Sequence, residues 1–213
     1  MSQPNNTMKD PHTCIPIGVD CSASHYLRAR GLRKEAFPFD WNVTPVLSAI
    51  RLIENGFEGF LDEEDLLFLP PTRRILFEEN GVDVKETEDI ITPVVCRRYG
   101  ILFPHDFSER GPADLPDVRR KYARRIDRLR EIIESPRERS FVFHVGDLNE
   151  WQLQQYRLAG IEVEDVSEEQ VREEFGKSRV AREKLISLES LRARRSPVRF
   201  VRHLLARGWR KVG

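Results

Sequence analysis

The pattern of apolar residues after position 90 constrains the fold more than any other feature of the chain. Short apolar runs, each long enough for one β-strand, alternate with segments whose apolar residues recur at helical spacing. The expected strands are 92–97, 101–103, 141–145 and 161–166, and the main helices between them are 117–134 and 150–159. Asn149 with Gln152 should cap the second of these helices, and Ser167 with Gln170 should cap a further helix. Such strand–helix alternation favours an α/β fold, in which helices cover a layered sheet with parallel strands.

The part of the chain before residue 90 predicts one further strand and two helices. Residues 15–19 form an apolar run typical of a buried strand, and a helix should follow from 23 to 30. Apolar residues on one face predict a second helix at 45–55. We therefore expect a strand to lead directly into a helix close to Cys21.

Three units organise the chain in this interpretation. Residues 1–13 form a loose leader, and residues 14–195 form a single catalytic-like α/β domain that ends in a strongly charged helix at 178–195. Residues 196–213 form a basic amphipathic helix, which should begin at the Ser196-Pro197 step.

Composition narrows the class of protein and its compartment. Of the 213 residues 39% are hydrophobic, including 12 Phe and 3 Trp, which is enough for a real core and argues against disorder. No run of 18 apolar residues occurs, and the polar N-terminus lacks the apolar region of a signal peptide. Three cysteines cannot all pair internally, so we expect free thiols in the cytoplasm and no cofactor.

The net charge of zero conceals a separation of charge along the chain. All 35 acidic residues lie at or before Glu189, whereas the last 24 residues carry eight basic ones. This division argues against a protein that binds nucleic acid in general, and it predicts that the basic tail, residues 190–213, binds an acidic partner. That partner is the acidic body itself, an anionic membrane surface at the inner face of the membrane, or another protein. The second would be contacted through Arg199, Arg202, Arg207 and Arg210.

Cys21 is the most informative single position. It follows an expected strand and opens an expected helix, where free N–H groups and the positive end of the dipole favour thiolate. We therefore expect a lowered pKa and a nucleophilic Cys21. His105, which precedes Asp106, is the first candidate for its base, and His25 is the second. The alternative is that Cys21 is a small buried residue.

Asp40 lies between Phe39 and Trp41 in a proline-containing loop. We expect it to be buried and to accept at least two hydrogen bonds, because a carboxylate among aromatic rings needs donors. It could orient His105, or it could cap the following helix at a corner packed with aromatic rings.

Two further groups of residues could carry chemistry. His144, Asp147 and Asn149 follow an expected strand, and with His105 and Asp106 they could form a metal site. The alternative is a satisfied histidine and an ordinary helix cap. The helix at 117–134 carries a basic face that could bind phosphate or, alternatively, be a solvated face paired with the acidic body.

Four motifs, in order along residues 15–145, resemble a bacterial family of papain-like cysteine peptidases. The motifs are Gly18-x-x-Cys21-x-x-x-x-Tyr26-Leu27-Arg28-x-x-Gly31-Leu32-Arg33, Pro38-Phe39-Asp40-Trp41, Phe103-Pro104-His105-Asp106-Phe107 and Tyr122-x-Arg124-Arg125-Ile126-x-Arg128-Leu129. The resemblance implies a nucleophile at Cys21 and a base at His105, and an α+β papain-like layout as the alternative fold. It leaves the third catalytic residue open among Asp40, Asp106, Asp147 and Asn149, with Asp40 preferred.

The resulting hypothesis is a thiol-dependent peptidase or acyltransferase that acts on a peptide or an acyl- or glycan-linked substrate. Substrate contacts are expected from Ser22, Trp41, Asp106 and Arg125, with no bound metal. Two other classes of function are kept open: an accessory protein of envelope glycan assembly that is non-catalytic or binds sugar phosphates, and a metal-dependent hydrolase.

Overall fold

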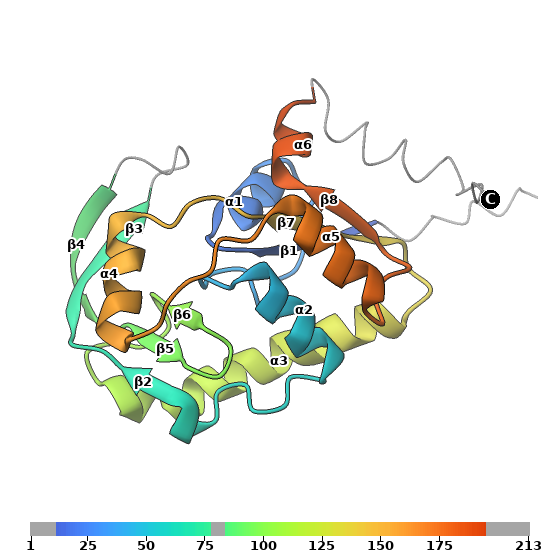
Figure 1. The fold of residues 1–213 in the computed structure, drawn as a ribbon. Coiled ribbons are helices and arrows are strands. Elements are labelled where there is room, and N and C mark those ends of the chain that lie inside the picture. Colours follow the sequence, from blue (N-terminus) through green and yellow to red (C-terminus); the bar gives the residue numbers. More distant parts are fainter. Residues whose placement is uncertain (1–11, 78–83, 195–213) are drawn as a thin grey trace, which may run out of the picture.

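The computed structural model describes residues 12–77 and 84–194, and a parallel sheet lies at its centre. The sheet has the order β1 (Thr13–Gly18), β7 (Arg139–His144), β8 (Lys184–Ser187), and both pairings are parallel. Its register places Gly18 beside His144, so that the carboxyl ends of β1 and β7 lie together. Figure 1 shows α1 (Ser22–Ala29) on one side of this sheet and α2 (Val46–Glu54) on the other.

Side chains on the two faces of the sheet enter different hydrophobic clusters. Ile15 and Ile17 of β1 belong to the large core with α2, whereas Cys14 belongs to a smaller cluster with Leu27 of α1. Burial on both faces is the usual condition of a parallel sheet, and it explains why residues 15–19 are apolar without alternation.

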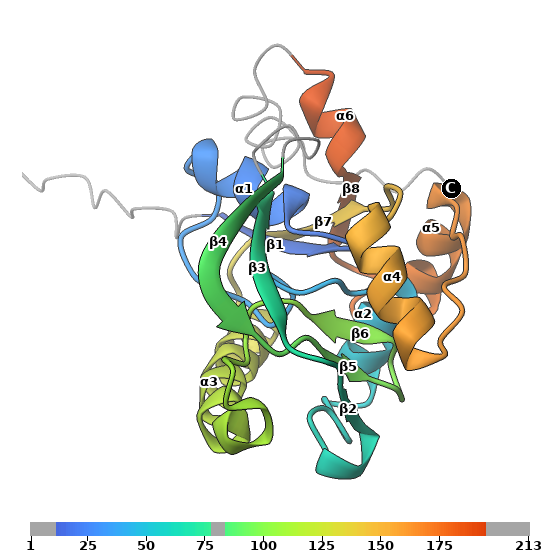
Figure 2. The same cartoon turned by 90° about the vertical axis from the view of Figure 1, so that its left-hand side faces the viewer.

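Two antiparallel units complete the β structure. The first is a three-stranded sheet in the order β2 (Leu66–Phe68), β5 (Val94–Cys96), β6 (Ile101–Phe103). The second is a hairpin of β3 (Thr72–Phe77) and β4 (Val84–Ile91). Figure 2 shows β4 on the outer side of this hairpin, above the helix α3 (Leu115–Glu134).

The remaining helices connect or follow the strands, and their ends match local sequence signals. They are α4 (Glu150–Ala159), α5 (Glu168–Lys177) and α6 (Leu188–Arg192), with short 3-10 turns at Glu63–Asp65 and Gly111–Asp114. Asn149 with Gln152, and Ser167 with Gln170, form the capping boxes that the sequence predicts. Gly160 ends α4 with a φ of 66°, which is a left-handed conformation that favours glycine.

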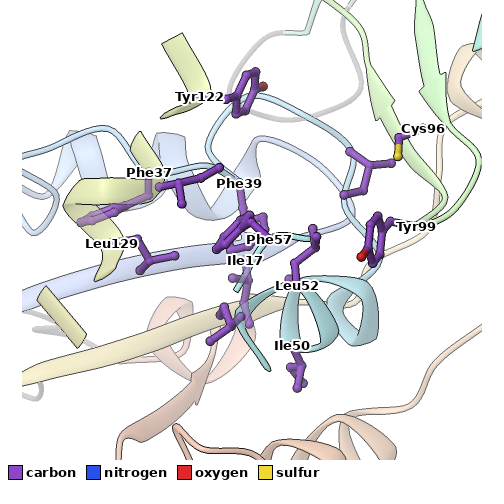
Figure 3. Close-up of a cluster of buried hydrophobic side chains, with 14 of the residues drawn as sticks. Ile17, Phe37, Phe39, Ile50, Leu52, Phe57, Cys96, Tyr99, Tyr122 and Leu129 are labelled. Atoms are coloured by element: carbon purple, nitrogen blue, oxygen red, sulfur yellow. The ribbon is translucent and has the colours of Figure 1, made fainter. Parts of the chain in front are cut away.

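The largest hydrophobic core lies between the parallel sheet, α2 and α3. Ile17, Phe39, Phe57 and Leu129 meet there, and all but Phe57 have at most 1% of their surface exposed. Figure 3 shows these side chains together with Tyr122, whose ring packs edge-on against Phe103 at 5.5 Å between centroids. Because Tyr122 and Phe103 belong to different motifs, the core itself brings those motifs together.

Most of the expected elements are confirmed, and the mixed α/β class with them. Residues 101–103 form β6 as expected, and the pairing of β5 with β6 is antiparallel. The expected helix 117–134 is α3, which begins two residues earlier. The proposed division into three units stays a prediction. Of the N- and C-terminal units, residues 1–11 and 195–213 lie outside the described residues, and the expected helix after residue 196 lies there too.

Two expectations are wrong. The strand expected at 161–166 is irregular: Ile161 and Val163 pack beside Tyr156, but the segment belongs to none of the three sheets. The alternation of apolar residues at 161–166 therefore reflects a segment that packs one side against the core without pairing as a strand. Of the single helix expected at 178–195, only α6 is helical within the described residues: residues 178–183 form turns, and β8 is a four-residue parallel strand beside β7. The sequence gives little signal for this strand, because it is short and charged residues flank it, and only Ile186 and Ser187 of it are buried.

Within residues 12–77 and 84–194, no helix has the length and apolar character needed to cross a membrane.

The core account predicts unequal effects for one substitution at two helical positions. Leu129→Ala in α3 removes a side chain with 0% exposure and should lower the free energy of unfolding by about 2–5 kcal/mol. Leu158→Ala in α4 is the matched control, because that side chain is 54% exposed, and should change it by less than about 0.5 kcal/mol. Urea unfolding of both variants measures the difference, and similar losses would contradict this description of the core.

Candidate functional site

Cys21 lies at the junction between β1 and α1, close to the carboxyl end of the parallel sheet. It occupies the N-cap position of α1, and its side chain accepts no capping hydrogen bond from the helix. Asp20 accepts the hydrogen bonds at this helix start instead: its Oδ1 accepts from the backbone N–H of Ser22 at 2.8 Å, and its Oδ2 accepts from the Ser22 hydroxyl at 2.8 Å. Cys21 is partly buried, whereas Cys14 and Cys96 have no exposed surface.

Asp40 is fully buried and saturated with hydrogen bonds, which confirms the expectation for this residue. Its carboxylate forms an ion pair with Arg33 and accepts from the backbone N–H of Phe37 at 2.8 Å and from Ser24 Oγ at 3.4 Å. Burial raises the pKa of Asp40, although the Arg33 guanidinium and the Phe37 N–H act in the opposite direction. The Arg33 guanidinium also lies over the ring of Trp41, 5.2 Å from its centroid. The PFDW loop is therefore held from within by its own carboxylate.

A second chain of hydrogen bonds holds Asp106. The Tyr122 hydroxyl donates to Asp106 Oδ2 at 2.7 Å and accepts from Asn42 Nδ2 at 3.3 Å, and Lys121 forms an ion pair with the same carboxylate. Burial and the neighbouring Asp106 raise the pKa of Tyr122, so its hydroxyl stays protonated and remains a donor. Asn42 Oδ1 in turn accepts from Thr44 Oγ1 at 2.7 Å.

This chain reaches the end of β1. The backbone N–H of Thr44 donates to the carbonyl oxygen of Gly18 at 3.0 Å, and Val43 pairs with Leu102 of β6 through two backbone hydrogen bonds. The PFDW loop therefore lies between β1 and β6, so that Asp40 and Asp106 are both close to the start of α1. Sequence reasoning missed Asn42 and Lys121, since an Asn after an aromatic motif and a Lys on a basic helix carry no distinctive signal.

The electrostatic surroundings of Cys21 are opposite to those expected. Burial, and then the charges of Asp20, Asp106 and Asp40, raise the pKa of the Cys21 thiol to about 12. The helix N-terminus was expected to lower this pKa, but burial and three carboxylates outweigh it. The same observation shows that the motifs containing Cys21, Asp40 and Asp106 come together, although they are distant in sequence.

His105 follows β6 and is neutral at physiological pH. Burial, and then the charge of Arg74, lower its pKa to about 4, while Asp106 acts to raise it. Its Nδ1 is buried without a hydrogen-bond partner among the described residues. His105 and Asp106 both line an open cavity of about 720 Å³. That His105 acts as the base for Cys21 stays a prediction; Asp106 is the residue whose charge acts on both.

The other expected site residues have defined surroundings. His25, the second candidate for the base, packs edge-on against Trp41 with 5.1 Å between ring centroids. Arg125 lies over the Tyr122 ring at 5.3 Å, and its Nη1 is buried without a hydrogen-bond partner among the described residues. The Ser22 hydroxyl and N–H are both engaged by Asp20. Roles in substrate binding for Ser22, Trp41, Asp106 and Arg125 stay predictions.

Several arginines on the basic face of α3 hold neighbouring loops through hydrogen bonds to backbone carbonyls. Arg119 donates to the carbonyl oxygen of Leu61 at 2.9 Å, Arg128 to that of Ala36 at 2.6 Å, and Arg130 to that of Gly56 at 2.6 Å. Charge-assisted hydrogen bonds to loop carbonyls account for these three arginines without a phosphate ligand.

His144 has two carboxylates beside its ring. Nδ1 lies 2.7 Å from Glu189 Oε1, and Nε2 lies 3.8 Å from Asp20 Oδ1. Gly146 packs so closely on the ring that a Cβ would not fit. Asn149 is used as the cap of α4, and Asp147 is exposed. Among the described residues no three His, Cys, Asp or Glu side chains gather as a metal ion would require, so the convergence required by the metal hypothesis is not found.

Comparison with known proteins places the chain in a family. Residues 12–160 match a family described as "Putative papain-like cysteine peptidase". The chain belongs to this family. The match covers β1 to α4, and therefore all four motifs and the residues around Cys21.

A curated relative gives no further indication of activity. "Uncharacterized protein R408" of Acanthamoeba polyphaga mimivirus is 29% identical over 134 residues, which are 60% of this chain and 59% of the relative. The chain thus matches less than two thirds of the length of that relative. A viral relative does not support the expectation that the family is bacterial. No solved structure matches the chain.

The raised pKa of Cys21 predicts how its alkylation depends on pH. Iodoacetamide reacts with thiolate, so labelling of Cys21 at pH 7 should be slow and should rise by about tenfold per pH unit up to pH 10. Cys21 should still react faster than Cys14 and Cys96, which have no exposed surface. Peptide mapping by mass spectrometry measures all three rates. A labelling rate already at its plateau at pH 7 would mean a low thiol pKa and would contradict this electrostatic description.

The buried ion pair of Asp40 predicts a large loss of stability when it is broken. Asp40→Ala leaves the Arg33 guanidinium buried without its partner and should cost about 3–5 kcal/mol. Asp40→Asn should cost less, because the amide oxygen can still accept from Phe37. The control is Asp127→Ala, which removes an exposed carboxylate paired with Arg130 and should cost at most about 1 kcal/mol. If the Asp40 and Asp127 variants unfold at the same urea concentration, this role of Asp40 is wrong.

Proposed function

We propose that the protein is a cysteine-dependent acyl-transfer enzyme of the peptidase type, with Cys21 as nucleophile and His105 as base. Family membership supports the chemical class. The observation that carries the assignment to Cys21 is the convergence of charges on its sulfur. Asp40 of the PFDW motif and Asp106 of the HDF motif both act on this one thiol, and Cys21 is the one cysteine of the three that is not fully buried.

The raised pKa determines how the reaction would begin. At neutral pH Cys21 is a thiol and His105 is a neutral imidazole, so no ion pair exists before substrate binds. The thiol proton must therefore move to His105 Nδ1 or Nε2, directly or through one water, while the sulfur forms its bond to the carbonyl carbon. Burial and three carboxylates disfavour a free thiolate, which makes transfer of the proton in concert with attack the consistent route.

The later steps follow from the same groups. Collapse of the tetrahedral intermediate breaks the bond to the leaving nitrogen or oxygen, which takes the proton from His105 and leaves a thioester on Cys21. Water then attacks the thioester carbon and gives a proton to His105; the C–S bond breaks, the acyl group leaves as a carboxylic acid, and the sulfur takes the proton back from His105 to restore the thiol. Because the Ser22 N–H is bonded to Asp20, the N–H of Ala23 is the first candidate to stabilise the oxyanion.

Asp106 is the better candidate for the third catalytic member, and Asp40 is better described as a positioning residue. Asp106 favours the protonated form of His105, which is the form that arises during the reaction. Both carboxylates are engaged in hydrogen bonds, but Asp40 is not among the charges that act on His105. This preference differs from the one drawn from the sequence, because hydrogen-bond partners cannot be assigned from spacing.

Turnover of fluorogenic peptidyl amides and activated thioesters tests the proposal. Cys21→Ser should abolish turnover, whereas Cys14→Ala, which removes a buried thiol from another cluster, should keep it. His105→Gln should lower kcat by roughly 10²–10⁴-fold, and His25→Gln should lower it by only a few-fold. Intact mass of wild-type protein mixed with a slow thioester should show one acyl group on Cys21. Turnover that survives Cys21→Ser, or an acyl group elsewhere, would overturn the proposal.

A further inference from the structure

The cavity that His105 and Asp106 line has a backbone edge along one side. Four consecutive residues of β4, from Glu88 to Ile91, line it. Side chains of a strand alternate between its two faces, so a cavity that meets four in a row lies at the edge of the strand and not on one face. Among the described strands β4 pairs only with β3, on its other side, so this edge before Ile91 can accept a further strand.

The opposite side of the cavity is formed by the segment from His105 to Arg110. This segment and β4 are joined at one point, where Ile91 forms an antiparallel bridge with Ser108. The N–H of Thr92 also donates to the carbonyl oxygen of Phe107 at 3.1 Å. From that point the two backbones separate, and the cavity opens between them. An extended peptide could therefore continue the β4 ladder from the place where the chain's own pairing ends.

The charge of the lining indicates what kind of peptide fits. Six carboxylates and three cationic side chains line the cavity. The three cations are already paired: Arg74 with Asp89, Arg110 with Asp114 and Lys121 with Asp106. Glu88 and Glu109 form no ion pair with a described residue, and Ile90, which also lines the cavity, is 39% exposed. The excess is negative, which favours a ligand with lysine or arginine side chains.

We propose that this cavity is a substrate groove that binds a basic polypeptide segment in extended conformation, added as a strand along the edge of β4. This inference rests on the proposed function, and it specifies the substrate class. Glu88 and Glu109 would contact the basic side chains of the peptide, and Ile90 an apolar one. The groove would carry the peptide past His105 and Asp106, which both line it, and Asp106 is the residue whose charge acts on Cys21.

Binding can be measured without turnover in the full-length Cys21→Ser variant. The probes are a fluorescein-labelled nine-residue peptide with lysine at alternate positions and the same peptide with glutamine in place of lysine, followed by fluorescence anisotropy. The lysine peptide should bind at least tenfold more tightly, and its affinity should fall as salt rises from 0.05 to 0.3 M. Methylation of alternate backbone nitrogens should abolish binding, because strand addition requires those N–H groups.

Charge reversal locates the site. Glu88→Lys combined with Glu109→Lys should weaken binding of the lysine peptide at least tenfold, while Glu131→Lys, an exposed carboxylate of α3 outside the cavity, should leave it within twofold. Equal binding of both peptides, or an equal loss in the control, would overturn the groove. Failure of catalysis is seen separately: a groove that binds the peptide in a wild-type protein without turnover would contradict the proposed function alone. Turnover of a small thioester without peptide binding would contradict the groove alone.

Discussion

The buried hydroxyl of Tyr122 is the contact on which the arrangement of the site depends. It donates to Asp106 and accepts from Asn42, and so it links the loop after β6 to the PFDW loop. Its ring belongs to the core and packs against Phe103 and Phe60, which fixes the hydroxyl in place. A hydroxyl that both donates and accepts in a dry site has one good geometry, because moving either neighbour leaves a buried polar atom unpaired.

Electrostatics around Cys21 follow from that arrangement. Two loops each bring one carboxylate toward the end of β1, and Asp20 adds a third, so the thiol is surrounded by negative charge and low polarity. The cations nearby are committed elsewhere: Arg33 to Asp40 and Lys121 to Asp106. A thiol is much less prone to oxidation than a thiolate, so the raised pKa should protect Cys21 from oxidation.

The sequence was informative where one short stretch decides the structure. Asn149 with Gln152 and Ser167 with Gln170 cap their helices as predicted, and the burial of Asp40 follows from a carboxylate placed between Phe39 and Trp41. It was misleading where a distant partner decides. β8 is a strand because it pairs with the edge of β7, whereas residues 161–166 pair with none of the described sheets. The predicted direction of the Cys21 pKa shift was wrong for the same reason, since Asp106 is 85 positions away along the chain but close in space.

The central claim is that Asp106 and Cys21 share one site, and the thiol pKa of Cys21 in an Asp106→Asn variant tests it most directly. Asparagine can still accept from Tyr122 and Lys121, so the fold is kept while the charge is lost. Thiolate absorbance near 240 nm, followed against pH with a Cys21→Ser blank, gives the pKa. The account predicts a lower pKa in Asp106→Asn than in the wild type, and no change in Asp127→Asn, whose carboxylate is not among the charges acting on Cys21. An unchanged pKa in Asp106→Asn would contradict the account.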